Sequence, residues 1–215
     1  MRGIIIGGGK VNDELICEQM KKGGYDLVIA ADAGMEVLYR HHLTPDIIVG
    51  DFDSVGKEAL SYFRSKERVE LIELSPVKDD TDIEYAIRDA ISRQVTELSI
   101  FGATGNRIDH VLGNIALLGI GIEHDVEIEI FDEYNHIRLV KDSLTMKKKE
   151  QYGKFVSILP YGACAKGVTL TGFKYNLSEC NLGGFNTLGI SNQIEDEEAV
   201  IQVKEGILLV IESRD

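Results

Sequence analysis

Two aspartates stand two positions apart in the stretch VGDFDSVG, directly after a short apolar run. The carboxylates of Asp51 and Asp53 could hold a metal ion, or the pair could simply turn the chain where a strand ends. Phe52, between them, is expected to point into the core, because side chains alternate along an extended backbone and both carboxylates would then face the same side. Taken alone, the pair is as typical of a turn as of a metal site.

A second acidic stretch, VKDDTD at residues 77–82, precedes a predicted helix. Thr81 and Glu84 form the Thr-x-x-Glu capping box, which predicts that the helix begins at Asp82. Acidic residues at a helix start are common without any function, since an aspartate there gains about 0.3 to 1 kcal/mol from the helix dipole. Alone, this stretch is more typical of helix capping than of a site.

The two acidic stretches become more informative together, because the predicted fold brings Asp79 and Asp82 toward the same edge as Asp51 and Asp53. Carboxylates ~5 Å apart repel each other by roughly 3 kcal/mol at an effective dielectric near 20. A divalent cation offsets this repulsion, and oxygen ligands without His or Cys suit Mg²⁺. A Mg²⁺ ion at a strand-end crevice indicates phosphoryl or nucleotidyl transfer.

The segment GATGNRIDHVLGN at residues 102–114 supplies a positive charge. Arg107 lies between glycines and a predicted helix, where a guanidinium can bind phosphate oxygens in bidentate fashion. Asp109 could cap this helix or orient Arg107, and the two roles are compatible. His110 is more typical of a hydrogen-bonded structural residue than of a general base. Asn114 could be a polar helix residue or a ligand contact.

The run GGGK at residues 7–10 invites comparison with phosphate-binding loops. Lys10 is followed by Val11, however, and the first glycine stands too close to the lysine for a Walker A loop. No third glycine completes a dinucleotide fingerprint. A tight strand-to-loop turn is therefore favoured, although backbone amides there could still face a phosphate.

Short apolar runs alternate with helical patterns through the first half of the chain. Several runs lack an in–out alternation, which is typical of strands covered on both faces. This order predicts an α/β domain with a doubly wound, mostly parallel sheet and flanking helices, in which ligands bind at the carboxyl ends of the strands. The runs are residues 3–6, 27–31, 47–49, 69–74, 98–101 and 126–131.

The pattern changes after about Tyr134 to β-rich segments separated by Gly, Asn and acidic turns. No long helical period is present there. This predicts a smaller C-terminal all-β domain, built as a sandwich or jelly roll. We therefore expect an α/β domain at residues 1–133 and a β-sandwich domain at residues 134–215.

The formal net charge of -13 argues against a broad nucleic-acid or anionic-membrane surface. An anionic ligand would need a local basic pocket or a bound cation. Cys17, Cys164 and Cys180 are odd in number and lack zinc-site or disulfide spacing, which favours reduced thiols. The apolar stretches are too short for a signal peptide or a membrane span. We expect a cytoplasmic protein.

The ordered set GDFDS, KDDTD, GATGNRIDHVLGN, TLTGFKYNL, TLGISN and EGILLVI resembles the thiamine pyrophosphokinase family. Each motif is weak alone, but the combination spans nearly the whole chain and is highly specific. The resemblance implies a catalytic α/β domain that binds ATP and Mg²⁺, a thiamine-binding β-sandwich, and a homodimer with active sites between subunits. The implied reaction moves the diphosphoryl group of ATP to the hydroxyl of thiamine, by in-line attack on the β-phosphorus, and gives thiamine diphosphate and AMP.

The resemblance also assigns individual residues by their position in these motifs. The implied Mg²⁺ ligands are Asp51, Asp53 and Asp82. The implied catalytic set is these three aspartates together with Asp79 and Arg107. The implied ATP side comprises Asp32, Lys78, Arg107, Asp109 and Asn114. The implied thiamine side comprises Ser191 and Asn192.

Two departures from the family pattern matter. The usual Gly-Gly-Arg run is Gly105-Asn106-Arg107 here, and Asn tolerates a left-handed backbone better than most residues. The chain has no Trp, so an aromatic that covers thiamine must be Tyr or Phe. The general base stays open between Asp79, a metal-bound water and no base. The alternative functions are a Mg²⁺-dependent nucleotide pyrophosphohydrolase and a non-catalytic thiamine or nucleotide sensor.

Overall fold

The computed structural model describes residues 1–53, 55–75, 80–184 and 186–215. The chain divides into two compact units, Met1–Glu133 and Tyr134–Asp215. Each unit has its own buried apolar core, so each is described separately.

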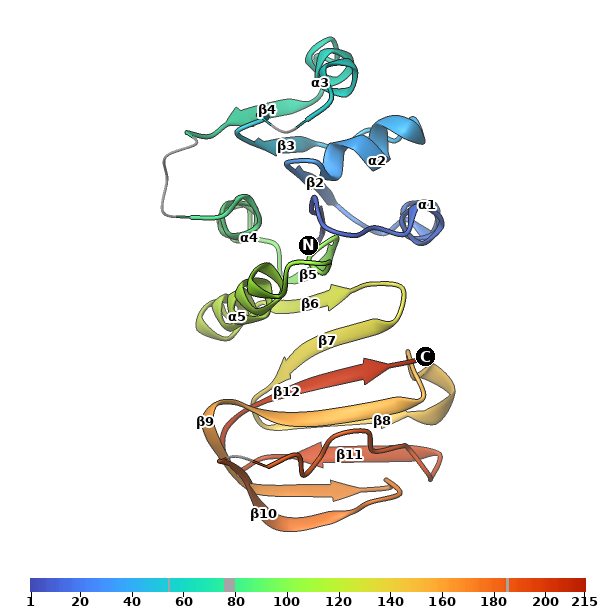
Figure 1. Cartoon of the computed structure of the whole chain (residues 1–215), viewed down its shortest axis with the longest axis vertical. Helices are drawn as coiled ribbons and strands as arrows, with labels where there is room; N and C mark the ends of the chain where they lie inside the picture. The colour runs from blue at the N-terminus through green and yellow to red at the C-terminus, as the bar shows by residue number, and fades with distance from the viewer. Residues whose placement is uncertain (54, 76–79, 185) are drawn as a thin grey trace. The chain divides into compact units, whose positions relative to one another are not determined.

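The first unit is built on a parallel sheet (Figure 1). Its described strands are β1 (Arg2–Ile6), β2 (Leu27–Ala31), β3 (Ile47–Gly50), β4 (Glu70–Glu73), β5 (Glu97–Phe101) and β6 (Glu127–Phe131). Their order is β4-β3-β2-β1-β5-β6, so the chain winds outward from β1 and then returns to add β5 on the other side. The predicted doubly wound α/β fold is confirmed, and its topological switch point lies between β1 and β5.

Helices cover both faces of this sheet. Figure 1 shows α1 and α2 on one side and α4 and α5 on the other. The helices are α1 (Asp13–Lys22), α2 (Gly34–Arg40), α3 (Lys57–Arg64), α4 (Asp82–Ser92) and α5 (Ile108–His124). Because both faces are covered, the central strands β1, β2 and β3 are almost entirely buried, as their continuous apolar sequence predicts.

Local signals in the sequence fix where two of these helices begin. The Asn12 side chain accepts a hydrogen bond from the Leu15 amide, and α1 begins at the next residue. The Thr81 hydroxyl accepts from the Glu84 amide at 3.2 Å, which confirms the predicted start of α4 at Asp82. The Glu84 carboxylate bonds to Arg88 one turn later, where an i, i+4 ion pair supports the helix.

The second unit is an antiparallel β structure in which the long strand β9 serves two layers. Its described strands are β7 (Asn135–Val140), β8 (Ser143–Lys147), β9 (Phe155–Thr171), β10 (Leu177–Gly183), β11 (Glu198–Gln202) and β12 (Glu205–Ser213), with a short 3₁₀ turn, η1 (Lys148–Glu150), after β8. The first half of β9 pairs with β12, which also pairs with β7. The second half pairs with β10 and with β11, which also pairs with β8.

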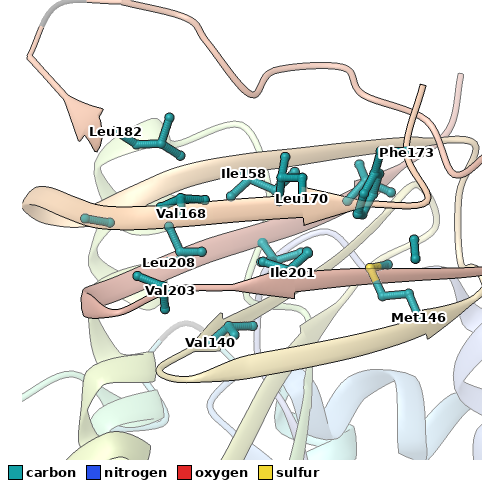
Figure 2. Close-up of a cluster of buried hydrophobic side chains, with 14 of the residues drawn as sticks. Val140, Met146, Ile158, Val168, Leu170, Phe173, Leu182, Ile201, Val203 and Leu208 are labelled. Carbon is teal, nitrogen blue, oxygen red and sulfur yellow. The ribbon is translucent and has the colours of Figure 1, made fainter. Parts of the chain in front are cut away.

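A shared apolar core lies between these layers. Figure 2 shows Ile158, Leu170, Phe173 and Ile201 converging within it, and Phe173 is among the most completely buried side chains of the chain. The predicted C-terminal β domain with an antiparallel, layered architecture is confirmed. Within the described ranges of both units, helices that are long and apolar enough to cross a bilayer are absent.

Candidate functional site

The first unit contains a cavity of about 970 Å³ at the carboxyl edge of its sheet. The loops that follow β1 and β5 line it, so it lies at the switch point, where doubly wound folds bind ligands. The first turn of α4 and the first half of α5 also line it. Its polar and charged lining includes Lys10, Asp32, Thr81, Asp82, Glu84, Thr104, Asn106, Arg107, Asp109, His110 and Asn114.

The glycines of GGGK let the loops after β1 and β5 pack together. The Gly9 amide donates to the Gly102 carbonyl and the Lys10 amide donates to the Thr104 carbonyl, each at 2.8 Å. A Cβ atom at Gly9 would collide with both of these carbonyl oxygens. The predicted tight strand-to-loop turn is confirmed. The amides of residues 9 and 10 are satisfied inside the protein, so they do not form a phosphate cradle.

Arg107 and Asp109 form an ion pair at the start of α5. The Arg107 guanidinium donates to both carboxylate oxygens of Asp109, at 2.6 and 3.3 Å. This hydrogen-bonded pair lowers the pKa of Asp109 and raises the pKa of Arg107 from their ordinary values. Arg107 itself occupies the N-cap position, without a side-chain capping bond. The sequence predicts that Asp109 caps this helix or orients Arg107. Because Arg107 and not Asp109 is the N-cap residue, the structure shows the second role.

Asn114 is a polar helix residue that also faces the cavity, and its contact with a ligand stays a prediction. Its amide nitrogen donates to the Ala103 carbonyl at 2.7 Å, which ties α5 to the loop after β5. The same side chain lines the cavity. Asn106 also lines it and does not adopt a left-handed conformation, so the turn before Arg107 does not depend on that property.

Asp32 and Asp82 reach the cavity from two different strand connections. Asp32 follows β2 in a left-handed conformation (φ 50°), and its amide donates to the Val49 carbonyl. Two residues later, Gly34 starts α2 against the end of β1, where a Cβ atom would collide with the Ile6 carbonyl. The sequence ADAG thus turns the chain sharply and leaves the Asp32 side chain at the carboxyl edge.

Asp51 and Asp53 form a local turn after β3, outside the lining of the cavity. The Asp53 amide donates to a carboxylate oxygen of Asp51 at 3.0 Å. Phe52 is 8% exposed and packs in the apolar core, as predicted. The predicted reason is wrong, however: Phe52 is left-handed (φ 60°), not extended. Such a conformation is rare for a bulky residue and is typical of functional sites.

The described residues do not include three carboxylates placed together as a ready-made metal site. Among the residues that it describes, no three His, Cys, Asp or Glu side chains are grouped closely enough to hold a metal ion. Mg²⁺ commonly needs only one or two carboxylates, with waters and substrate phosphates completing its shell. The all-oxygen donor set of Asp51, Asp53 and Asp82 fits that mode of binding. Lys78 and Asp79 lie outside the described residues.

Asn192 in the second unit is a structural clamp. It is 2% exposed, and its side-chain oxygen accepts from the amides of Tyr175 and Gln193. Its side-chain nitrogen donates to the Tyr175 carbonyl at 2.8 Å. Sequence analysis missed this partner because the two residues are far apart in the chain. These bonds fix the backbone of Tyr175, whose side chain is largely exposed. Ser191, directly before Asn192 in the chain, is also exposed.

Replacing Asn192 with Ala should lower the free energy of unfolding of the second unit by about 1–3 kcal/mol, because buried backbone groups lose their partners. Hydrogen exchange should show faster exchange at the amides of Tyr175 and Gln193. Gln202→Ala, at an exposed position on β11, is the control and should leave both rates unchanged. Unchanged exchange in Asn192→Ala would contradict the clamp.

Comparisons with known proteins agree across both units. Residues 21–130 match the family model for the thiamin pyrophosphokinase catalytic domain, and residues 141–208 match that for its vitamin B1 binding domain. The thiamine pyrophosphokinase of Bacillus subtilis is 32% identical over 198 residues, which cover 89% of each chain.

Solved structures give the same result. The crystal structure of thiamine pyrophosphokinase from Bacillus subtilis matches with a TM-score of 0.90 at 30% identity, and the match covers 100% of both chains. That from Geobacillus thermodenitrificans has a TM-score of 0.86 at 30% identity and covers 100% of this chain and 98% of the other. With sequence and fold in agreement over both units, the chain belongs to the thiamin pyrophosphokinase family.

Proposed function

We propose that this protein transfers the diphosphoryl group of ATP to the hydroxyl of thiamine, the activity for which its family is named. The observation that carries the proposal is the cavity at the switch point of the first unit. Acidic residues and Arg107 line it together. This combination suits a polyphosphate that is bound both by cationic side chains and through a divalent ion.

In the proposed reaction, the hydroxyl oxygen of thiamine attacks the β-phosphorus of ATP. The new bond joins this oxygen to the β-phosphorus, the bond between the α,β-bridging oxygen and the β-phosphorus breaks, and AMP leaves with the bridging oxygen. The hydroxyl proton passes to solvent or to a nearby base. Because no covalent intermediate with the protein is needed, the side chains act by alignment and by charge.

Arg107 is the proposed cationic contact to the phosphates. Its guanidinium is hydrogen-bonded to Asp109, which favours one orientation of this exposed side chain before a ligand arrives. A planar guanidinium can then exchange or share its donors with phosphate oxygens in bidentate fashion. Asp32 and Asn114 are proposed nucleotide contacts because both line the same cavity. Lys78 and Asp79 keep their predicted roles on the ATP side and in catalysis.

Asp51, Asp53 and Asp82 are the residues that we propose hold Mg²⁺. Bound Mg²⁺ would neutralise negative charge on the phosphates of ATP. Asp82 is at the start of α4, a helix that packs against β1, β2 and β3, and Asp51 and Asp53 directly follow β3. Parallel strands and the helices that follow them present these positions at the same edge. The carboxylates would therefore approach the nucleotide from one side of the sheet.

We also propose that the second unit binds thiamine near Ser191 and Asn192 and that the protein is a homodimer. Asn192 would contribute to this site by holding the backbone of Tyr175 in place.

Support for the dimer comes from Ile108 and Leu112, two large apolar side chains that are exposed one turn apart on α5. Light scattering of the purified protein measures the oligomeric state directly.

The described cysteines are free thiols, in keeping with the proposed cytoplasmic location.

Incubation with ATP, thiamine and Mg²⁺ tests the proposed reaction. We expect AMP and thiamine diphosphate in equal amounts. Release of ADP would rule out diphosphoryl transfer. Consumption of ATP at the same rate without thiamine would support the nucleotide pyrophosphohydrolase, and ligand binding without turnover would support the sensor.

A further inference from the structure

We propose that Lys10 binds the phosphate chain of the nucleotide through its ammonium group. The inference rests on the proposed function, because it concerns the phosphate donor, and it gives the GGGK motif a role that its glycines do not supply. The geometry points to Lys10 for three reasons: a fixed backbone position, an uncommitted charge and an acidic surrounding.

The backbone of Lys10 is fixed at the rim of the cavity. Its amide donates to the Thr104 carbonyl at 2.8 Å, one residue after the matching bond from Gly9 to Gly102. These bonds attach the lysine to the loop that also carries Arg107. The two cationic residues therefore come from neighbouring strand ends and line one cavity, although they are far apart in the sequence.

Among the residues that the structure describes, the charge of Lys10 has no protein partner, whereas Arg107 must share its donors between Asp109 and a ligand. Arg107 is already in a two-bond ion pair with Asp109. The ion pairs within the described part of the chain do not include Lys10. An exposed, strongly hydrated ammonium on a flexible stem can move to a phosphate without first breaking a bond to the protein.

The surrounding negative charges favour an additional cation for binding the phosphate chain. Carboxylates outnumber cationic side chains in the cavity lining, and the whole chain carries a formal charge of -13. A polyphosphate entering this cavity therefore meets a lining with more negative than positive side chains, and a further cation reduces the repulsion. Lys10 differs from the lysine of a Walker A loop, because the amides of residues 9 and 10 are occupied by protein carbonyls. Recognition here would use the ammonium as a point charge.

The first test compares steady-state kinetics of the full-length wild type with Lys10→Met, which removes the charge and keeps an unbranched side chain. We expect the KM for ATP to rise about tenfold, with kcat and the KM for thiamine changed less than about threefold, since a charge that binds substrate and transition state equally alters KM alone. Lys10→Arg should recover most of the loss. Lys22→Met, at the exposed end of α1, is the matched control and should behave like wild type.

Equilibrium binding separates a phosphate contact from a structural effect. In the absence of thiamine, Lys10→Met should bind ATP about tenfold more weakly than wild type and bind adenosine equally well. Unchanged ATP affinity in Lys10→Met, or an equal loss for ATP and adenosine, overturns the assignment of Lys10. If the wild type transfers diphosphate but Lys10→Met matches it in both assays, only this inference fails. If the wild type neither transfers diphosphate nor binds ATP, the proposed function fails with it.

Discussion

Asp51→Asn is expected to lower kcat/KM for thiamine diphosphate synthesis by about 10²- to 10⁴-fold. The proposed role of Asp51 is to hold Mg²⁺ beside the phosphates, and such charge stabilisation is worth several kcal/mol in the transition state. The amide that replaces the carboxylate is neutral and is a weak ligand for this hard cation. Transfer activity should therefore fall sharply and should respond to a higher Mg²⁺ concentration.

The same variant should keep the fold of the first unit. Asp51 accepts a hydrogen bond from the Asp53 amide, and the side-chain oxygen of an asparagine can accept that bond in the same place. Asp51 is only partly buried, so the change does not strand a charge or open a cavity. Denaturant unfolding should show a midpoint close to that of wild type.

The measurement is AMP and thiamine diphosphate formation over a range of Mg²⁺ concentrations. Glu67→Gln is the matched control, because it removes one negative charge at an exposed position outside the cavity lining. It should retain wild-type rates. If Asp51→Asn retains them as well, the residues after β3 form a turn without a metal-binding role.

The alternation of strands and helices in the first unit, and the sheet edge at which its cavity lies, could be predicted because both follow from local patterns. Continuous apolar runs identified the buried strands, and Thr81 identified the start of α4. Residues directly after such strands in a doubly wound sheet must lie at its carboxyl edge. These inferences needed only neighbouring residues and one topological rule.

Other features depend on contacts between distant segments, and sequence reasoning missed or misjudged them. Residue 9 must be glycine because a Cβ atom there would collide with the carbonyl oxygens of residues 102 and 104. The side chain of Asn192 is hydrogen-bonded to the backbone of Tyr175. Phe52 reaches the core through a left-handed backbone that its bulky side chain disfavours. In each case the tertiary partner outweighs the local preference.

Glu212 in the second unit is another residue whose role depends on partners that are distant in the sequence. The alternating pattern of β12 places Glu212 on the buried face together with Leu208 and Val210, and it is 3% exposed. A carboxylate at such a position must be paired. It accepts hydrogen bonds from His136 and Arg138 of the adjacent strand β7, at 3.2 and 2.6 Å, and from the Tyr152 amide at 2.8 Å.

Glu212→Gln should therefore lower the free energy of unfolding of the second unit by about 3 kcal/mol, because it removes the buried negative charge that pairs with Arg138 and His136. Denaturant unfolding of the full chain, with hydrogen exchange at the amides of β7 and β12, measures the loss in this unit. Glu205→Gln is the matched control on the same strand. Glu205 pairs with Lys166 at the exposed surface, so this variant should stay close to wild type.

The pH dependence of the difference between wild type and Glu212→Gln tests the role of the charge. Burial opposes ionisation of Glu212, but hydrogen bonds from His136 and the Tyr152 amide, and the charge of Arg138, outweigh it and hold its pKa below the ordinary value. A carboxylate whose pKa is lower in the folded than in the unfolded state stabilises the protein at pH values above its unfolded-state pKa. This stabilisation is lost as the pH falls through the folded-state pKa. The difference should thus be largest at neutral pH and should shrink in acid. A constant difference would mean that Glu212 stabilises the unit by packing and not by its charge.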